Sequence, residues 1–267
     1  MKLKRKSVAK PWGRQDLPDL FGGERKQKIG EIWFEPPEPI TPALMVKYLF
    51  TSEKLSIQVH PDDRLARRFG LPHGKDECWY VMEAEPGAVL GIGLKKSVST
   101  AKLRAAIACD QIEQLVNWKP VSAGDYYYIP AGTIHAIGPG VTLVEIQQNI
   151  DVTYRIYDYG RPRELHLDEA LTVAKPEVYD MSGHSIVNPA ESSILADGPH
   201  FRLLHAVGDE TETIGKMKAG EWQVVPLEGS VKINNVNISA GQCGLCASAG
   251  EIDLSKNRRS LIACTMR

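Results

Sequence analysis

The sequence predicts a mainly β fold, a sandwich or barrel of the jelly-roll type. Short segments of alternating apolar and polar residues recur along the 267-residue chain, separated by Pro, Gly or Asn. Helical patterns are few and do not connect successive strands, as they would in a parallel sheet. We expect two related halves, residues 1–180 and 181–267, with a helical insertion near residues 97–118 in the first.

The first half contains the clearest alternation. A short helix is expected over residues 61–69, because Asp62 and Asp63 favour a helix start. Ser97 and the hydroxyl residues after it predict the start of the inserted helix, and Pro176 ends another helix that begins at Leu167. Strands are expected over residues 30–35, 44–50, 55–60, 77–83, 89–93, 124–129 and 141–146.

The second half has the same strand character. Asn234 and Asn235 separate two alternating runs and predict a hairpin turn. The tripeptide Ser122–Gly124 recurs as Ser239–Gly241, and this offset places Ile252 at the position of His135. If the repeat is real, the second half has the fold and lacks the metal ligand. Strands are expected over residues 201–204, 221–226, 229–238 and 261–264.

Composition excludes several classes of protein. The chain has 32 basic and 33 acidic residues and a net charge of −1, so no general field recruits nucleic acid or an acidic membrane. No apolar stretch has the length of a membrane span, and no apolar core follows the basic residues 1–13 to make a signal peptide. We expect a cytoplasmic protein with no nucleic-acid or membrane partner. The sequence leaves its oligomeric state, monomer or dimer, open.

The five cysteines do not form the framework of a secreted protein, because their number is odd and they are widely scattered. Cys243 and Cys246 form a CxxC, which could be a redox pair or half of a zinc site. No second CxxC accompanies it, and the pair lies in a strand-like region. We expect buried structural cysteines with reduced thiols.

A metal site is predicted where Gln58 and His60 end an apolar run. Side chains at i and i+2 on a strand point to one face, so both can reach a single ion. Glu77 follows in the chain, and Pro130 and Gly132 shape a turn that sets His135 at a strand start. One amide oxygen, two imidazoles and a carboxylate suit zinc, although Mn, Fe or Co would also fit.

These motifs carry a family resemblance. The spacing from Gly124 to His135 resembles the second motif of the cupin superfamily, whose first motif normally offers His-x-His where this chain has Gln58-x-His60. With that departure, the chain resembles type I mannose-6-phosphate isomerase, and its overall length resembles the short bacterial form of that family. The resemblance covers roughly residues 8–175 and is carried by Lys10–Gly13, Leu55–Asp63, Gly74–Tyr80, Pro130–Ala136 and Thr153–Tyr159.

The resemblance implies a double-stranded β-helix that binds one Zn²⁺ per chain through Gln58, His60, Glu77 and His135. It also implies roles in catalysis. Lys75 matches a lysine implicated in proton transfer, and desolvation beside a cation is expected to lower its pKa, although a solvated loop lysine is the alternative. Arg155 matches the active-site arginine of the family, with a strand-edge ion pair as the alternative.

The implied substrate is a sugar phosphate. Lys47, Ser56 and Arg161 fall where the family places phosphate contacts, and Arg161 replaces what is more often a lysine. Trp12 is expected either to wall the sugar site or to pack in the core.

Three functions remain open. The first is the zinc-dependent interconversion of mannose 6-phosphate and fructose 6-phosphate, through an enediol(ate) or by a metal-assisted hydride shift. The second is a metal-holding cupin that senses a sugar phosphate without turnover. The third is an iron oxygenase, but this sequence lacks the His-x-His that is usual for that function. Fold alone does not separate them.

Overall fold

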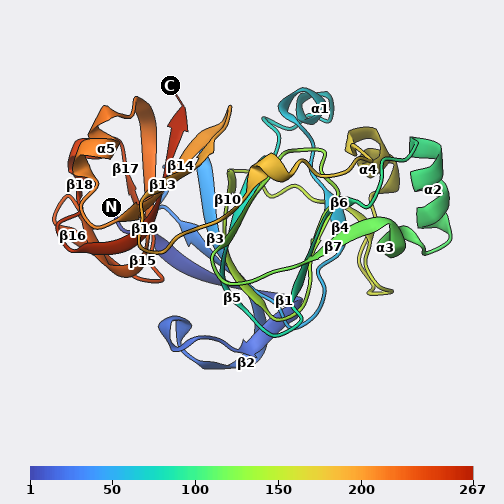
Figure 1. The fold of residues 1–267 in the computed structure, drawn as a ribbon, viewed down its shortest axis with the longest axis horizontal. Coiled ribbons are helices and arrows are strands. Elements are labelled where there is room, and N and C mark those ends of the chain that lie inside the picture. Colours follow the sequence, from blue (N-terminus) through green and yellow to red (C-terminus); the bar gives the residue numbers. More distant parts are fainter. Residues whose placement is uncertain (267) are drawn as a thin grey trace.

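The computed structural model describes residues 1–266 and confirms the mainly β prediction. Three sheets of antiparallel strands make up the fold, joined by few helices. A central sheet packs one face against a second sheet and the other face against a third, which is formed by the C-terminal part of the chain. Figure 1 shows the third sheet in orange and red at one side and the other two sheets around a barrel.

The central sheet contains seven strands, in the order β1-β2-β3-β10-β5-β8-β12. Long stretches of it are buried on both faces, because another sheet covers each. Its strands are β1 (Lys4–Asp16), β2 (Glu24–Glu35), β3 (Leu44–Phe50), β5 (Glu77–Ala84), β8 (Asp125–Ile129), β10 (Val141–Gln148) and β12 (His184–Ile186).

The second sheet faces the central one across the barrel and has five strands, in the order β11-β4-β9-β6-β7. Three of these strands are only three or four residues long, so loops contribute much of this wall. They are β4 (Ile57–Val59), β6 (Val89–Leu94), β7 (Val116–Pro120), β9 (His135–Ile137) and β11 (Tyr154–Tyr157).

The third sheet is built around the longest strand, β15, which pairs with β16, β17, β18 and β19. The predicted hairpin turn at Asn234 and Asn235 is confirmed: both residues have positive φ, as a turn between β15 and β16 requires. The strands are β13 (Ser193–Asp197), β14 (Phe201–Val207), β15 (Ala219–Ile233), β16 (Val236–Ser239), β17 (Gly244–Cys246), β18 (Ile252–Asp253) and β19 (Asn257–Met266).

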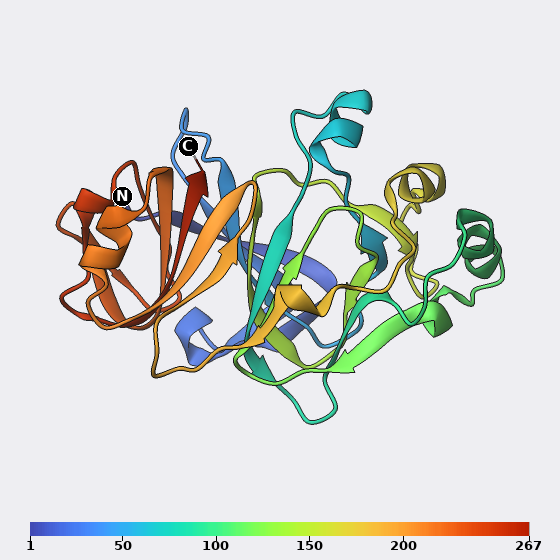
Figure 2. The same ribbon diagram turned by 45° about the horizontal axis from the view of Figure 1, so that its top comes forward.

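The helices are short and lie outside the barrel. The predicted helix after His60 begins at Asp63, where the side chain of Asp62 caps the backbone N–H of Leu65. The predicted insertion contains two helices, which lie far from the third sheet in Figures 1 and 2. The helices are α1 (Asp63–Arg68), α2 (Thr100–Ala108), α3 (Ile112–Leu115), α4 (Leu167–Val173) and α5 (Thr211–Lys216).

Strand β10 shows how the central sheet serves two cores. All of its residues are buried. Val144 and Ile146 pack with residues of the third sheet, whereas Val141 and Leu143 pack inside the barrel. Because side chains alternate along a strand, Glu145 shares the barrel face with Val141 and Leu143. A charged side chain is thereby carried into the barrel by the same alternation that builds the cores.

Two segments connect the first block, residues 1–180, with the C-terminal block, residues 181–266. β12 lies beyond residue 180 but pairs with β8 of the central sheet. The chain start reaches the other way: the backbone N–H of Leu3 donates to Cys243 O, and that of Leu245 donates to Met1 O. The two-domain division at residue 180 stays a prediction, and position 267 of the predicted second block lies outside the described residues.

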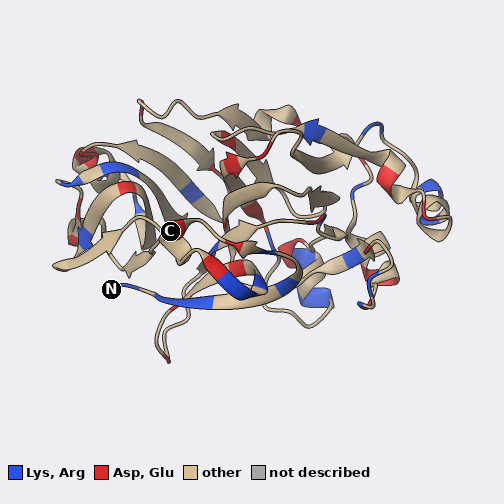
Figure 3. Ribbon diagram, turned by 90° about the horizontal axis from the view of Figure 1, so that it is seen from below, with Lys and Arg blue, Asp and Glu red and all other residues tan. Residues whose placement is uncertain are grey.

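Charge is dispersed over the surface. Figure 3 shows basic and acidic residues interspersed on the strands of both blocks. Within residues 1–266, no helix has the length and apolar character needed to cross a bilayer.

Candidate functional site

The second sheet brings three predicted site residues into one row. Gln58 on β4 pairs with His135 on β9 on one side and with Arg155 on β11 on the other. Residues that are directly opposite each other on neighbouring strands share a face. The three side chains therefore come from residues far apart in sequence and stand next to one another on one wall of the barrel.

The central sheet provides the opposite wall. Glu145 on β10 is paired with Lys47 on β3 and with Trp79 on β5, and Gln147 is paired with Glu77. The Oε1 atom of Glu145 lies 3.4 Å from Lys47 Nζ, and Trp79 Nε1 donates to Glu145 Oε2 at 3.2 Å. All these side chains are buried, so the barrel encloses a group of charges that are stabilised by one another.

His60, Glu77 and His135 form a compact cluster where the two walls meet, with their nearest ligand atoms all within 4.8 Å of one another. Nε2 of His60 lies 3.5 Å from Glu77 Oε2, and Nε2 of His135 lies 3.4 Å from Glu77 Oε1. Each of the three side chains is only 1 % exposed. Among the described residues, neither carboxylate oxygen of Glu77 has a hydrogen-bond partner, so a buried acceptor faces each ring, Oε2 facing His60 and Oε1 facing His135.

The cluster attracts a cation. The ammonium group of Lys75 lies 2.6 Å from Glu77 Oε2 and 3.1 Å from His60 Nε2. An unpaired charge at this depth would cost several kcal/mol, so positive charge is favoured at this point. Two imidazoles and a carboxylate are suitable ligands for a divalent transition ion. These observations fit a metal held by His60, Glu77 and His135.

Gln58 stands beside this cluster. Its amide Nε2 lies 3.2 Å from Nε2 of His135, and its Oε1 accepts a hydrogen bond from Ser56 Oγ at 3.2 Å. A half-turn of the amide about its last side-chain bond would present the oxygen to the cluster. Gln58 as the fourth ligand stays a prediction.

Burial sets the protonation of the two histidines. It lowers the pKa of His60 well below its usual value, assisted by the nearby charge of Lys75. Burial also lowers the pKa of His135 to about 4. Both rings are therefore neutral at pH 7, which is the form that ligates metals. The ring of His135 is also oriented, because its Nδ1 bonds the carbonyl oxygen of Thr133 at 2.9 Å.

The acidic and basic groups respond differently. Burial raises the pKa of Glu77 to about 7 against the opposing effect of Lys75. Burial alone would raise the pKa of Glu145, but Lys75 and Lys47 outweigh it and the pKa is lowered. For Lys75, burial acts to lower the pKa, yet Glu77 and Glu145 outweigh it and raise the pKa overall. Two buried carboxylates thus raise the pKa of Lys75, and the lowering expected beside a bound cation stays a prediction.

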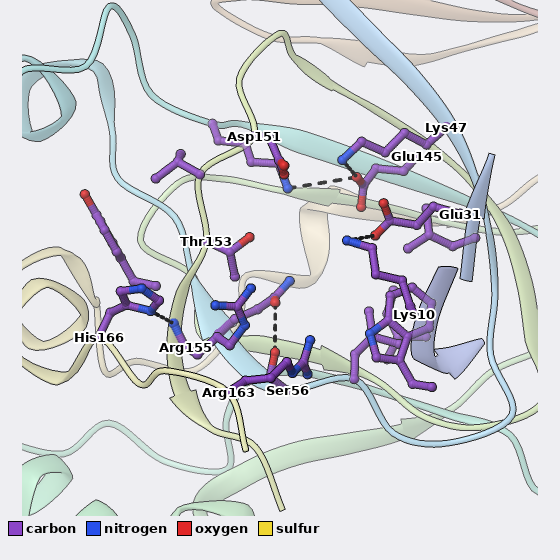
Figure 4. A pocket seen from close by; sticks show the side chains of 18 residues that line it. Lys10, Glu31, Lys47, Ser56, Glu145, Asp151, Thr153, Arg155, Arg163 and His166 are labelled. Atoms are coloured by element: carbon purple, nitrogen blue, oxygen red, sulfur yellow. Dashed lines mark hydrogen bonds and ion pairs between the residues drawn. The ribbon is translucent and has the colours of Figure 1, made fainter. Parts of the chain in front are cut away.

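A cavity of about 350 Å³ opens onto this arrangement. Gln58 and Lys75 line it, whereas His60, Glu77 and His135 do not. Figure 4 shows Arg155, Arg163 and Ser56 next to one another, with the Lys10–Glu31 and Lys47–Glu145 pairs across the cavity. The predicted site residues that line it are Trp12, Lys47, Ser56, Gln58, Lys75 and Arg155.

Arg161 is the predicted site residue that lies elsewhere. Its guanidinium donates to the backbone oxygen of Lys54 at 2.7 Å and pairs with Asp158 at 2.9 Å, and it is absent from the cavity lining. The same Asp158 accepts two hydrogen bonds from Arg163, and Arg163 does line the cavity. The loop after β11 thus presents its second arginine to the site.

Several lining residues are not among those predicted from the sequence, above all Glu145, Arg163 and His166. Glu145 carried a usable signal, since it is the one charged residue in the apolar run from Val141 to Ile146. His166 carried none, because its place depends on the loop: its Nδ1 accepts the backbone N–H of Arg155 at 3.3 Å.

Trp12 is 3 % exposed and packs with the barrel core, and it also lines the cavity. Its contact with a sugar stays a prediction. Arg155 is also partly enclosed, and burial followed by the charge of Arg163 lowers its pKa. Among the described residues, its Nε atom has no hydrogen-bond acceptor. A partly enclosed guanidinium whose Nε has no acceptor is suited to bind an anionic group that enters the cavity.

Comparisons with known proteins find relatives of this chain in sequence and in fold. No family model matches the sequence. Mannose-6-phosphate isomerase of Streptococcus mutans is 33 % identical over 239 residues, which cover 84 % of this chain and 69 % of the relative. Mannose-6-phosphate isomerase ManA of Bacillus subtilis is 38 % identical over 137 residues, 49 % of this chain and 43 % of the relative.

Solved structures extend the match to the whole fold. The crystal structure of mannose 6-phosphate isomerase from Bacillus subtilis has a TM-score of 0.77 and 25 % identity, and the match covers 98 % of each chain. A phosphomannose isomerase variant from Salmonella typhimurium has a TM-score of 0.71 at 14 % identity, over 100 % of this chain and 99 % of the other, and shows the fold alone.

Proposed function

The chain belongs to the mannose-6-phosphate isomerase family, and from that premise we propose that it interconverts mannose 6-phosphate and fructose 6-phosphate with one zinc ion per chain. The observation that carries this proposal is the buried His60–Glu77–His135 cluster next to a cavity lined by Arg155, Arg163 and Lys75. A metal ion and a set of cations beside one cavity suit a substrate that gains negative charge during reaction. The proposed setting is the cytoplasm.

The donor set supports a zinc ion. His60, Glu77 and His135 would hold it, with Gln58 as the fourth ligand, and both rings are already neutral. Zinc bound here supplies Lewis-acid stabilisation of negative charge on the oxygens of the substrate. Arg155 would add charge-assisted hydrogen bonds to the same oxygens, because its guanidinium enters the cavity beside Gln58.

Proton transfer is assigned to Lys75 and Glu145. Aldose–ketose isomerisation removes a proton from the carbon next to a carbonyl and returns it to the neighbouring carbon through an enediol(ate). Lys75 is held charged by its two carboxylate neighbours and is therefore the acid, whereas the ionised Glu145, 3.9 Å from Lys75 Nζ, is the base. Both line the cavity, so protons can be exchanged between them within reach of substrate.

We propose that Arg163 and Ser56 bind the phosphate, with Arg163 in the place expected for Arg161. Asp158 fixes the guanidinium of Arg163 through two hydrogen bonds at 2.6 and 2.5 Å and leaves its remaining edge for the ligand. Lys47 would be a poorer phosphate contact than expected, because Glu145 already neutralises it inside the barrel.

A coupled assay tests the proposal. Protein loaded with Zn²⁺ should convert mannose 6-phosphate to fructose 6-phosphate, chelated protein should not, and added Zn²⁺ should restore the rate. Metal-loaded protein that binds mannose 6-phosphate without turnover would replace the isomerase by the sensor function. Restoration by Mn²⁺ or Co²⁺ but not by Zn²⁺ would contradict the choice of metal alone.

A further inference from the structure

Asp76 stands between Lys75 and Glu77, yet its side chain faces away from the cavity. Its Oδ1 accepts the backbone N–H of Ala131 at 2.9 Å, and its Oδ2 accepts the hydroxyl of Tyr128 at 2.6 Å. The residue is 8 % exposed, so a carboxylate has been taken out of water to make these contacts. Burying a charge costs free energy unless the charge is hydrogen-bonded. The hydrogen bonds of the Asp76 side chain meet this condition, but none of them is made to a residue that lines the cavity.

The partner of Asp76 is a turn that touches the other two metal-ligand candidates. The turn runs from Pro130 to Thr133. The backbone N–H of Gly132 donates to the carbonyl oxygen of His60 at 2.8 Å. The carbonyl oxygen of Thr133 bonds Nδ1 of His135 at 2.9 Å. With Asp76 next to Glu77 in the chain, one turn is connected to all three cluster residues.

The C-terminal block reaches the same carboxylate. The loop between β13 and β14 places His200 Nε2 4.0 Å from Asp76 Oδ2, and it packs Phe201 against the ring of Tyr128 at 5.6 Å between centroids. Gly198 allows this approach, because a Cβ there would lie 2.9 Å from the Tyr128 hydroxyl. The loop of residues 198–201 is thereby in contact with both groups that hold the turn.

We propose that Asp76 is a positioning residue for the metal ligands, and that the loop of residues 198–201 keeps it in place through Tyr128 and His200. Groups that orient metal ligands through hydrogen bonds typically change metal affinity by about 10–100-fold when removed. The C-terminal block, of which no described residue lines the cavity, then acts on the metal site across the central sheet. This inference rests on the proposed function only in requiring that His60, Glu77 and His135 bind a divalent ion.

Cobalt binding measures the effect without catalysis. The affinity for Co²⁺ is measured by competition with a chelator, and its visible absorbance spectrum reports ligand geometry. Asp76→Asn should weaken the affinity by about 10-fold and alter the spectrum, and Tyr128→Phe should act in the same direction. Because both act through one hydrogen bond, the double variant should lose less than the product of the two single losses.

The barrel offers matched controls. Asp125 is 7 % exposed and, like Asp76, accepts a backbone N–H and contacts a histidine, His184, but it does not touch the turn. Tyr179 donates its hydroxyl to the carbonyl oxygen of Tyr128 instead of to Asp76. Asp125→Asn and Tyr179→Phe should leave Co²⁺ affinity within about twofold.

Substitutions at two glycines test whether the C-terminal block affects metal binding. Gly198→Ala should displace the Tyr128 hydroxyl and weaken Co²⁺ binding, whereas Gly215→Ala should not, because a Cβ at Gly215 meets nothing within 4 Å. His200→Ala should weaken binding by about two- to fivefold, as expected for a partly exposed polar contact at 4.0 Å.

The outcomes separate the two proposals. If Asp76→Asn binds Co²⁺ as tightly as Asp125→Asn, the positioning role of Asp76 is overturned. If Gly198→Ala and His200→Ala both bind like Gly215→Ala, the role of the loop is overturned. If the unsubstituted protein binds no Co²⁺, the metal site of the proposed function itself fails.

Discussion

The barrel encloses charged side chains beside an apolar core, whereas the core of the C-terminal block is apolar throughout. Lys47, Lys75, Glu77 and Glu145 are buried between the first two sheets. The C-terminal core has the same strand architecture and is filled by aliphatic side chains and the buried Trp222. Enclosed charges cost free energy that apolar side chains would save. The barrel interior thus combines stability with groups suited to chemistry, whereas the side chains of the C-terminal core contribute to stability.

The largest effect that we expect from a change in the barrel is a loss of turnover rate without a loss of fold. Arg155→Ala should lower the turnover of mannose 6-phosphate by about 10³-fold, because donors aimed at developing charge contribute that much. Metal content and thermal midpoint should stay as in the unsubstituted protein. Metal analysis and the coupled assay check this.

The control for Arg155 lies in the C-terminal block. Arg259 is also an arginine on a strand, paired with Glu228 at 3.2 Å, and it is absent from the cavity lining. Arg259→Ala should turn over normally. Equal losses of rate in the two variants would remove Arg155 from the mechanism.

The second prediction reverses the first, with a loss of fold and no loss of rate. Ile252 is 4 % exposed in the C-terminal core. Ile252→Ala should lower the free energy of unfolding by about 3 kcal/mol, the cost of a cavity in a packed core. Denaturant unfolding measures the change, and turnover below the transition should be unaltered. A selective loss of rate would show that this core is tuned for catalysis.

The third prediction concerns the replacement of a buried ion pair of the barrel by apolar side chains, the kind that fills the C-terminal core. The double variant Lys47→Met/Glu145→Leu should be inactive yet as stable as the original protein or more stable by about 1–2 kcal/mol, because apolar pairs often outperform buried ion pairs. Lys47→Met alone should destabilise, since it leaves Glu145 without its neighbour at 3.4 Å.

The exposed pair Lys216–Glu212 on α5 is the control for that double variant. Its replacement by the same Met and Leu should change stability little, as expected for a surface pair. A double variant of Lys47 and Glu145 that unfolds more easily than the single one would show that the buried charges stabilise the barrel.

The smallest expected effect concerns the CxxC. Burial raises the pKa of Cys246 to about 12, and it raises the pKa of Cys243 as well. Both thiols should stay protonated and react slowly with iodoacetamide at pH 8, where the exposed Cys109 reacts. Cys246→Ala should leave the Zn²⁺ content unchanged. Peptide mapping and metal analysis would expose a redox or zinc role if either expectation failed.

Much of the fold could be predicted from local patterns. The turn at Asn234 and Asn235 and the helix after Asp62 follow from chemistry within a few residues. The double burial of the central sheet could not be predicted this way. Alternation places Glu145 on one face of β10, but only the third sheet, from distant sequence, makes the opposite face a core.

The candidate site divides in the same way. His60, Glu77 and His135 belong to short motifs, and the structure brings them together as the motifs imply. The sequence could not indicate which of Arg161 and Arg163 lines the cavity, because the two are separated by one proline and both contact Asp158. The path of the loop decides this. The raised pKa of Lys75 depends first on Glu77 and then on Glu145. Glu77 is two residues away in the sequence, whereas Glu145 approaches Lys75 only in three dimensions.

The pairing of β12 with β8 has a practical consequence for dissecting the protein. A fragment cut at residue 180 would leave β8 as an open edge, with free N–H and C=O groups ready to recruit another chain. Such a fragment is expected to aggregate even though it holds every residue of the cavity lining. A fragment that retains residues 181–187 would keep that edge covered.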